Sequence, residues 1–171
     1  MGGSVFLTLF FGLFLAVGIS ILGFGLRSLY MSKQAETWPT TPGRIVSSDL
    51  NASTDSDGDT TYRTELTYAY NVMGRELTGE KIAFGYSGSS SRNFHSEIYD
   101  ALPANTQIAV RYNPADPERA VLSFGMNQSI IFLIIFGVVW TFFTLGMMSM
   151  FWLSAQGAGG LLGNIIIYAR G

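Results

Sequence analysis

Residues 61–79 read TYRTELTYAYNVMGRELTG, and their pattern decides how the middle of the chain folds. From Tyr62 to Val72, every second residue is aromatic, aliphatic or threonine, and most of the intervening residues are polar. This alternation with a period of two is typical of a strand with one buried face. The pair Met73-Gly74 favours a tight hairpin turn, so residues 75–84 are expected to form the return strand.

The residues around this hairpin predict three further strands, which makes about five in all. RIVSSDL, at residues 44–50, precedes a polar loop and is expected to form the first strand. TQIAVRYN, at 106–113, alternates again, and AVLSF, at 120–124, is long enough for a short last strand.

A short helix and a turn complete the predicted domain. Residues 94–102 place Phe, Ile and Leu at helical spacing, with Ser91 or Asn93 as the cap and Pro103 at the end. Before the last strand, proline fixes φ and short polar side chains bond the nearby backbone. The residues expected to close this structural turn are Asn113, Pro114, Asp116 and Pro117.

Two apolar runs without charge flank the domain. No charged residue occurs at 1–26 or 120–169, and all 12 acidic and 8 of the 10 basic residues lie at 31–119. A membrane-spanning helix needs about 20 apolar residues. A cleavable signal peptide is disfavoured, because no basic residue precedes the first run and its apolar core is too long. The expected organisation is a transmembrane helix at 1–30, a soluble β-rich domain at 31–124, a second transmembrane helix at 126–153, and a Gly-rich breaker with an apolar C-terminal segment at 154–171.

Composition excludes several classes of protein. The chain has 171 residues, a net charge of -2 and no cysteine. Nucleic-acid binding is not expected, because it needs a basic surface. A disulfide scaffold and a thiolate metal site are excluded.

The order of several motifs resembles a known family. Trp38 and PGRIV (42–46) are followed by LTYAY (66–70), VRYNPADP (110–117) and AVL (120–122). This order is similar to that of the DUF3592 family, membrane proteins of unknown function, over residues 38–124 and the flanking spans. The family usually carries Gly where this chain has Asn105. The resemblance implies the architecture above and brings no activity and no functional residues.

Few residues suggest chemistry, and no catalytic residue and no cofactor are predicted. His95, the only histidine, lies in a Ser/Gly-rich stretch and is expected to be solvated. Asp55, Asp57 and Asp59 resemble the start of a calcium loop. An EF-hand would need Gly and Glu where Thr60 and Leu66 stand, so only a different, weak Ca²⁺ site stays open.

The leading hypothesis is a non-enzymatic accessory or scaffold protein that assembles with other membrane subunits or with itself in the bilayer. Small residues every four positions let helices approach closely in lipid, whether the partner is the second span or another subunit. The alternatives are an oligomeric pore and a sensor that binds a ligand at the Asp55–Asp59 loop or at the aromatic face of Tyr62, Tyr68 and Tyr70. The residues predicted to mediate helix packing or assembly are Gly12, Ala16, Ser20, Leu161, Ile165 and Ile166.

The expected location is a bacterial inner membrane or plasma membrane. Basic residues near the membrane ends gather on the domain's side, so the positive-inside rule favours a cytoplasmic domain. The rule weakens for inserts longer than about 60 residues, so the opposite side stays open.

Overall fold

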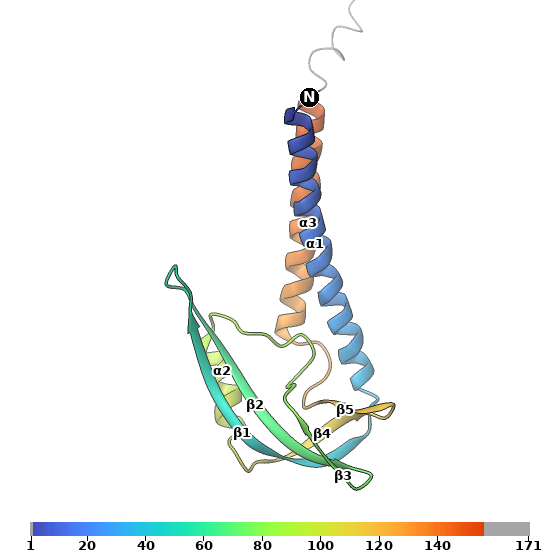
Figure 1. Cartoon of the computed structure of the whole chain (residues 1–171), viewed down its shortest axis with the longest axis vertical. Helices are drawn as coiled ribbons and strands as arrows, with labels where there is room; N and C mark the ends of the chain where they lie inside the picture. The colour runs from blue at the N-terminus through green and yellow to red at the C-terminus, as the bar shows by residue number, and fades with distance from the viewer. Residues whose placement is uncertain (1, 156–171) are drawn as a thin grey trace, which may run out of the picture. The chain divides into compact units, whose positions relative to one another are not determined.

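The computed structural model describes residues 2–155, and it confirms the predicted architecture (Figure 1). A five-stranded antiparallel sheet and one short helix are preceded and followed in the chain by a long helix. The chain divides into two compact units. The first unit combines the residues up to Gly23 with those from Ile134, and the second unit is Phe24–Leu133. The predicted assembly residues Leu161, Ile165 and Ile166 lie outside the described residues. The elements are α1 (Gly2–Ala35), β1 (Thr40–Thr54), β2 (Thr60–Val72), β3 (Arg75–Gly79), α2 (Arg92–Ala101), β4 (Gln107–Asn113), β5 (Asp116–Val121) and α3 (Gln128–Ala155).

In the first unit, α1 and α3 contact each other where small residues allow it. A Cβ atom at Gly18 would lie 2.7 Å from Cδ1 of Trp140, and one at Gly137 would lie 2.8 Å from the backbone nitrogen of Leu22. The indole Nε1 of Trp140 donates a hydrogen bond of 2.9 Å to the carbonyl oxygen of Phe14, and the two rings stack. The polar atom of a residue in the middle of an apolar helix is thereby satisfied.

Both long helices are long and apolar enough to cross a membrane. Much of their apolar surface is uncovered by the described chain: Phe6 is 67 % exposed and Phe142 is 70 % exposed. α1 continues to Ala35, beyond the expected end at residue 30, and its last turns belong to the Phe24–Leu133 unit.

The sheet has the strand order β3-β2-β1-β4-β5. β1 pairs with β2 along most of its length, and the first residues of β1 pair with β4. Met73 and Gly74 have positive φ angles of 52° and 79°, as a type I′ hairpin turn requires. The pairing of β1 with β2 shifts register between Ile45 and Ser47, which marks a bulge.

The return strand is shorter than expected, because β3 ends at Gly79 and not at residue 84. A Cβ atom at Gly79 would lie within 2.7 Å of the ring and hydroxyl of Tyr68, so the chain passes closely over that side chain. Residues 80–87 then leave the sheet, and Ile82 and Phe84 are buried. Ser89 returns to β2 and forms an isolated bridge with Tyr62.

Two clusters of buried side chains hold the second unit together. The buried face of β2 is the one that the alternation predicts, and α2 packs against β2 and β1. The smaller cluster lies where the chain leaves α1, and it consists of Ala35, Trp38, Phe84 and Val121. The larger cluster consists of Ile45, Leu66, Tyr68, Tyr70, Val72, Ile82, Val110 and Ala120.

Polar bonds tie the segment after β3 to the ends of the long helices. Asn127 caps α3 by accepting the backbone N–H of Ile130 at 3.0 Å, and its Nδ2 donates to the carbonyl oxygen of Phe84 at 2.9 Å. The hydroxyl of Ser32 in α1 donates to the carbonyl oxygen of Gly125 at 2.7 Å. These bonds position residues 80–87 beside the end of α1.

Asn105 explains the departure from the family pattern. Its φ is +72°, a left-handed conformation that glycine adopts without strain and that asparagine tolerates better than most residues. Its backbone N–H donates to the carbonyl oxygen of Ile45 at 2.8 Å. Asn105 therefore adopts in this turn a conformation that glycine could also adopt.

Candidate functional site

The Phe24–Leu133 unit contains a cavity of about 780 Å³. Its wall is formed by the last turns of α1, by β1 and β2, and by residues 80–87, with Arg119 of β5 at one side. This volume falls within the range of about 300–1,000 Å³ that small-molecule sites occupy.

The wall of this cavity, which we call the juxtamembrane cavity, is charged in both signs. Arg63 pairs with Glu65 at 3.9 Å, and Nζ of Lys81 lies 5.0 Å from the ring centroid of Phe84. The remaining four charged groups make no hydrogen bond or ion pair with any described residue. These four are Arg27, Arg119, Asp49 and Glu80.

Hydroxyl-bearing and apolar side chains form the rest of the wall. Phe24 and Met31 come from α1, and Ile82 and Phe84 come from the segment after β3. The charged and the apolar side chains line the same cavity. The cavity therefore has the chemistry to hold a molecule that carries both apolar and charged parts.

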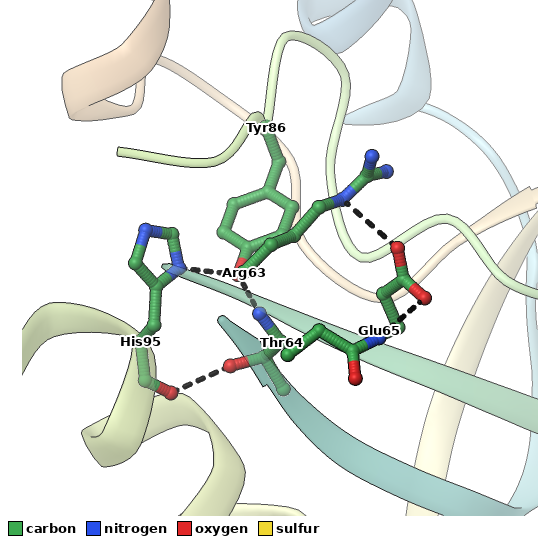
Figure 2. Close-up of polar contacts among 6 residues, drawn as sticks. Arg63, Thr64, Glu65, Tyr86 and His95 are labelled. Atoms are coloured by element: carbon green, nitrogen blue, oxygen red, sulfur yellow. Dashed lines mark hydrogen bonds and ion pairs between the residues drawn. The ribbon is translucent and has the colours of Figure 1, made fainter. Parts of the chain in front are cut away.

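His95 lies in a second polar cluster, next to the segment that lines the cavity (Figure 2). Its side chain is completely buried, so the expectation that it is solvated is wrong. Nδ1 lies 2.8 Å from the hydroxyl of Tyr86, and Nε2 lies 2.9 Å from Oγ of Ser89. The Tyr86 hydroxyl also accepts the backbone N–H of Thr64 at 3.1 Å, and the Thr64 hydroxyl donates to the carbonyl oxygen of His95 at 2.6 Å.

This arrangement keeps His95 neutral. Burial, and secondly the positive charge of Arg63, lower the pKa of His95 below its ordinary value. In one tautomer Tyr86 donates to Nδ1 and Nε2–H donates to Ser89; in the other both roles are reversed. In either tautomer both ring nitrogens are bonded.

The pair of Ser89 and His95 has the spacing of a nucleophile and a base, and sequence spacing did not indicate it. In a Ser-His-acid triad, however, a carboxylate orients the imidazole. Here Nδ1 meets the hydroxyl of Tyr86, which already accepts the N–H of Thr64. We therefore interpret the cluster as a latch that joins α2, β2 and residues 86–89, and we call it the His95 latch.

In the loop that contains Asp55, Asp57 and Asp59, the side chain of Asp55 has a structural role. Its Oδ1 accepts the backbone N–H of Asp57 at 3.0 Å and that of Asp59 at 2.9 Å, which closes the turn between β1 and β2. Among residues 2–155, no three Asp, Glu or His side chains converge as a metal site. The loop therefore gives no support to a calcium sensor.

The expected aromatic ligand face is wrong for Tyr68 and Tyr70, because both are buried in the core. Their hydroxyls donate to the carbonyl oxygens of Lys81, at 3.1 Å, and of Pro117, at 2.7 Å. Burial, followed by the neighbouring Tyr70, raises the pKa of Tyr68. Tyr62 is half-buried. These rings are packing groups.

The small residues of α1 lie on its exposed side. Gly12, Ala16 and Ser20 are all exposed, and a Cβ atom at Gly12 would meet no atom within 4 Å. The side of α1 that contacts α3 carries Phe11 and Gly18 instead. The sequence left two partners open for this face, the second long helix and another subunit. The second long helix does not pack against this face.

Only part of the predicted turn before the last strand is a turn in the structure, and the rest belongs to the strand β5. Asn113 pairs with Asp116, and Oδ1 of Asn113 accepts the backbone N–H of Ala115 at 3.0 Å. Asp116 and Pro117 already belong to β5, since that strand begins at Asp116. Pro114 lies in the turn between them.

Comparison with protein-family models gives a match over the middle of the chain. Residues 41–127 match the family model of a domain of unknown function, DUF3592. The matched range runs from β1 to the residue before α3. No curated protein matches the chain.

Proposed function

The chain belongs to the DUF3592 family, and we propose that it is a non-enzymatic membrane protein whose β domain binds a ligand in the juxtamembrane cavity. The observation that carries this proposal is the set of four unpaired charged groups in the wall of one cavity. Charged groups of both signs that could neutralise each other, and do not, are available to a ligand. The proposal keeps the sensor or binding-module function that the sequence left open and places it at a different site.

Two long apolar helices support the membrane part of the proposal. Large exposed apolar surfaces are rare on soluble monomers, and lipid would cover side chains such as Phe6 and Phe142. Close approach at Gly18 and Gly137 suits a pair of helices in lipid, where small residues favour packing.

The non-enzymatic part of the proposal is supported by the His95 latch. Each polar atom of the His95 side chain is engaged with Tyr86 or Ser89, and no carboxylate contacts Nδ1. A general base needs a partner placed to orient it and a substrate within reach. The buried imidazole of His95 therefore fits a structural role better than the role of a general base.

A cavity-filling variant tests the binding function. Thr67 lines the cavity, so Thr67→Trp should displace a bound molecule, whereas Ser53→Trp, near the end of β1 and outside the wall, should not. The full-length protein would be extracted from its native membrane and measured by native mass spectrometry. We expect a non-covalent mass on the wild type and on Ser53→Trp that is lost in Thr67→Trp. The same mass on all three, or on none, contradicts the proposal.

A second candidate function is assembly as an accessory or scaffold subunit, either with another membrane protein or with a second copy. The exposed face of Gly12, Ala16 and Ser20 favours it, because helices approach closely over small residues. The variant Gly12→Leu with Ala16→Leu should break such a complex in mild detergent. Gly146→Leu is the matched control, since Gly146 of α3 also has open space around it. An intact complex in the double variant contradicts this function.

The proposed location is a bacterial inner membrane or plasma membrane, with the domain in the cytoplasm. Basic residues at Arg27, Lys33 and Arg44 support this side. The chain has no cysteine, so Ser53→Cys provides a single thiol on the hairpin. A membrane-impermeant maleimide should fail to label it in intact cells and should label it after lysis. Labelling in intact cells contradicts the placement.

A further inference from the structure

We propose that the juxtamembrane cavity holds the headgroup of a zwitterionic phospholipid, with the phosphate on arginine and the ammonium group on the acidic residues. The inference rests on the proposed binding function and names the chemical class of its ligand. Three features of the wall carry it: its position on α1, its unpaired arginines and its unpaired carboxylates.

The cavity begins where the uncharged part of α1 ends. Residues 1–26 carry no charge, and Arg27 is the first charged residue of the chain. Phe24, Arg27, Ser28 and Met31 all line the cavity. If α1 spans the bilayer, a lipid headgroup lies at the same level as these residues.

The arginine side chains are free to bind phosphate. The guanidinium groups of Arg27 and Arg119 line the cavity and make no hydrogen bond or ion pair with any described residue. A guanidinium group forms two parallel hydrogen bonds to a phosphate, and these are stronger than bonds between neutral groups. Arg27 lies on the long apolar helix α1, whereas Arg119 lies on the sheet strand β5, and we therefore assign the phosphate to Arg27.

The carboxylates distinguish a zwitterionic from an anionic headgroup. Asp49 and Glu80 line the same cavity and are likewise unpaired among residues 2–155. They would repel a headgroup that carries only negative charge. An ammonium group beside the phosphate gives each of these carboxylates a partner, as in phosphatidylethanolamine.

The apolar wall favours a lipid over a soluble phosphate ester. Phe24 and Met31 of α1, with Ile82 of the segment after β3, give the cavity an apolar part. Glycerol and the first carbons of acyl chains would cover these side chains, whereas free glycerophosphoethanolamine would leave them uncovered.

The test is native mass spectrometry of the full-length protein in detergent, titrated with phosphatidylethanolamine, with phosphatidylglycerol of the same acyl chains, and with soluble glycerophosphoethanolamine. We expect phosphatidylethanolamine to bind at least tenfold more tightly than the other two probes. Arg27→Gln should weaken its binding at least tenfold. Arg92→Gln, on α2 and outside the wall, should not change it.

Each other outcome overturns the inference in a different way. Equal binding of phosphatidylglycerol rejects the zwitterionic headgroup, and equal binding of the soluble ester rejects a lipid source. Unchanged binding in Arg27→Gln rejects the assigned phosphate contact. If Thr67→Trp removes a native ligand that is not a phospholipid, the lipid inference fails while the proposed binding function stands. If no mass depends on the cavity at all, both fail.

Discussion

The His95 latch and the juxtamembrane cavity differ in how their polar groups are used, although one segment, residues 80–91, contributes to both. In the latch, both ring nitrogens of His95 are hydrogen-bonded, one to Tyr86 and one to Ser89, and Thr64 bonds the Tyr86 hydroxyl and the His95 carbonyl oxygen. In the cavity wall, Arg27 and Arg119 have no partner among the described residues. The polar groups of the latch have partners within the protein, whereas the arginine side chains of the cavity wall are available to a ligand.

This difference separates structure from function. A buried polar group without a partner costs roughly 1–3 kcal/mol, so a buried histidine persists only when it is bonded. Charged groups on an open wall keep contact with water and cost little in the free protein. Substitutions in the latch should therefore change stability, and substitutions in the cavity wall should change binding.

The largest effect is expected for His95→Ala. It removes a completely buried ring and one hydrogen bond from each of the hydroxyls of Tyr86 and Ser89. We expect the free energy of unfolding of the domain to fall by about 2–4 kcal/mol, as for other large buried side chains. Thermal unfolding of the sheet, followed by circular dichroism of the full-length protein in detergent, measures it. An unchanged melting temperature would contradict the latch.

A smaller loss is expected for Tyr86→Phe. The ring stays in the cavity wall, but the hydroxyl that serves both His95 and the N–H of Thr64 is lost. The loss should be about 1–3 kcal/mol, measured by the same unfolding experiment. Ligand binding should persist, because the ring remains. A variant that binds no ligand yet melts like the wild type would reverse the assigned roles.

The latch also predicts a pH dependence. Because the pKa of His95 is lowered in the folded protein, the unfolded chain takes up the proton first as the pH falls below about 6.5. Stability should then decrease by up to about 1.4 kcal/mol per pH unit, until the pH reaches the folded pKa. Melting temperatures between pH 7.5 and 5.5 measure this, with His95→Gln as the comparison. Equal slopes for the wild type and the variant would exclude His95 as the cause.

The smallest effect on stability is expected for Arg27→Gln. Arg27 is exposed and unpaired among residues 2–155, and surface substitutions of this kind change stability by less than about 0.5 kcal/mol. The melting temperature without ligand should match that of the wild type, and only the stabilisation by added phosphatidylethanolamine should disappear. A large loss of stability without ligand would show that Arg27 belongs to the fold.

The hydrophobic core of the sheet could largely be predicted from the sequence, because it follows from a local pattern. The alternation in β2 places Leu66, Tyr68, Tyr70 and Val72 on one face, and that face is the buried one.

The site could not be predicted in the same way. The partners of His95 come from a Gly/Ser-rich segment without periodicity, so its burial depends on contacts that no spacing encodes. The wall of the cavity combines α1, β1, β2, residues 80–87 and β5. Its charged groups are dispersed through the sequence and resemble ordinary surface residues until the fold brings them together. The end of β3 at Gly79 similarly depends on the ring of Tyr68 across the sheet.

The most direct test of the central claim is photo-crosslinking in the native membrane. A benzophenone amino acid at Ser47, in the cavity wall, is compared with the same residue at Ser53, beyond it on the same strand. After irradiation, intact mass measurement of the full-length protein identifies any adduct. We predict a small-molecule adduct at position 47 that is absent at position 53. No adduct at either position, or the same adduct at both, would contradict a ligand site in the juxtamembrane cavity.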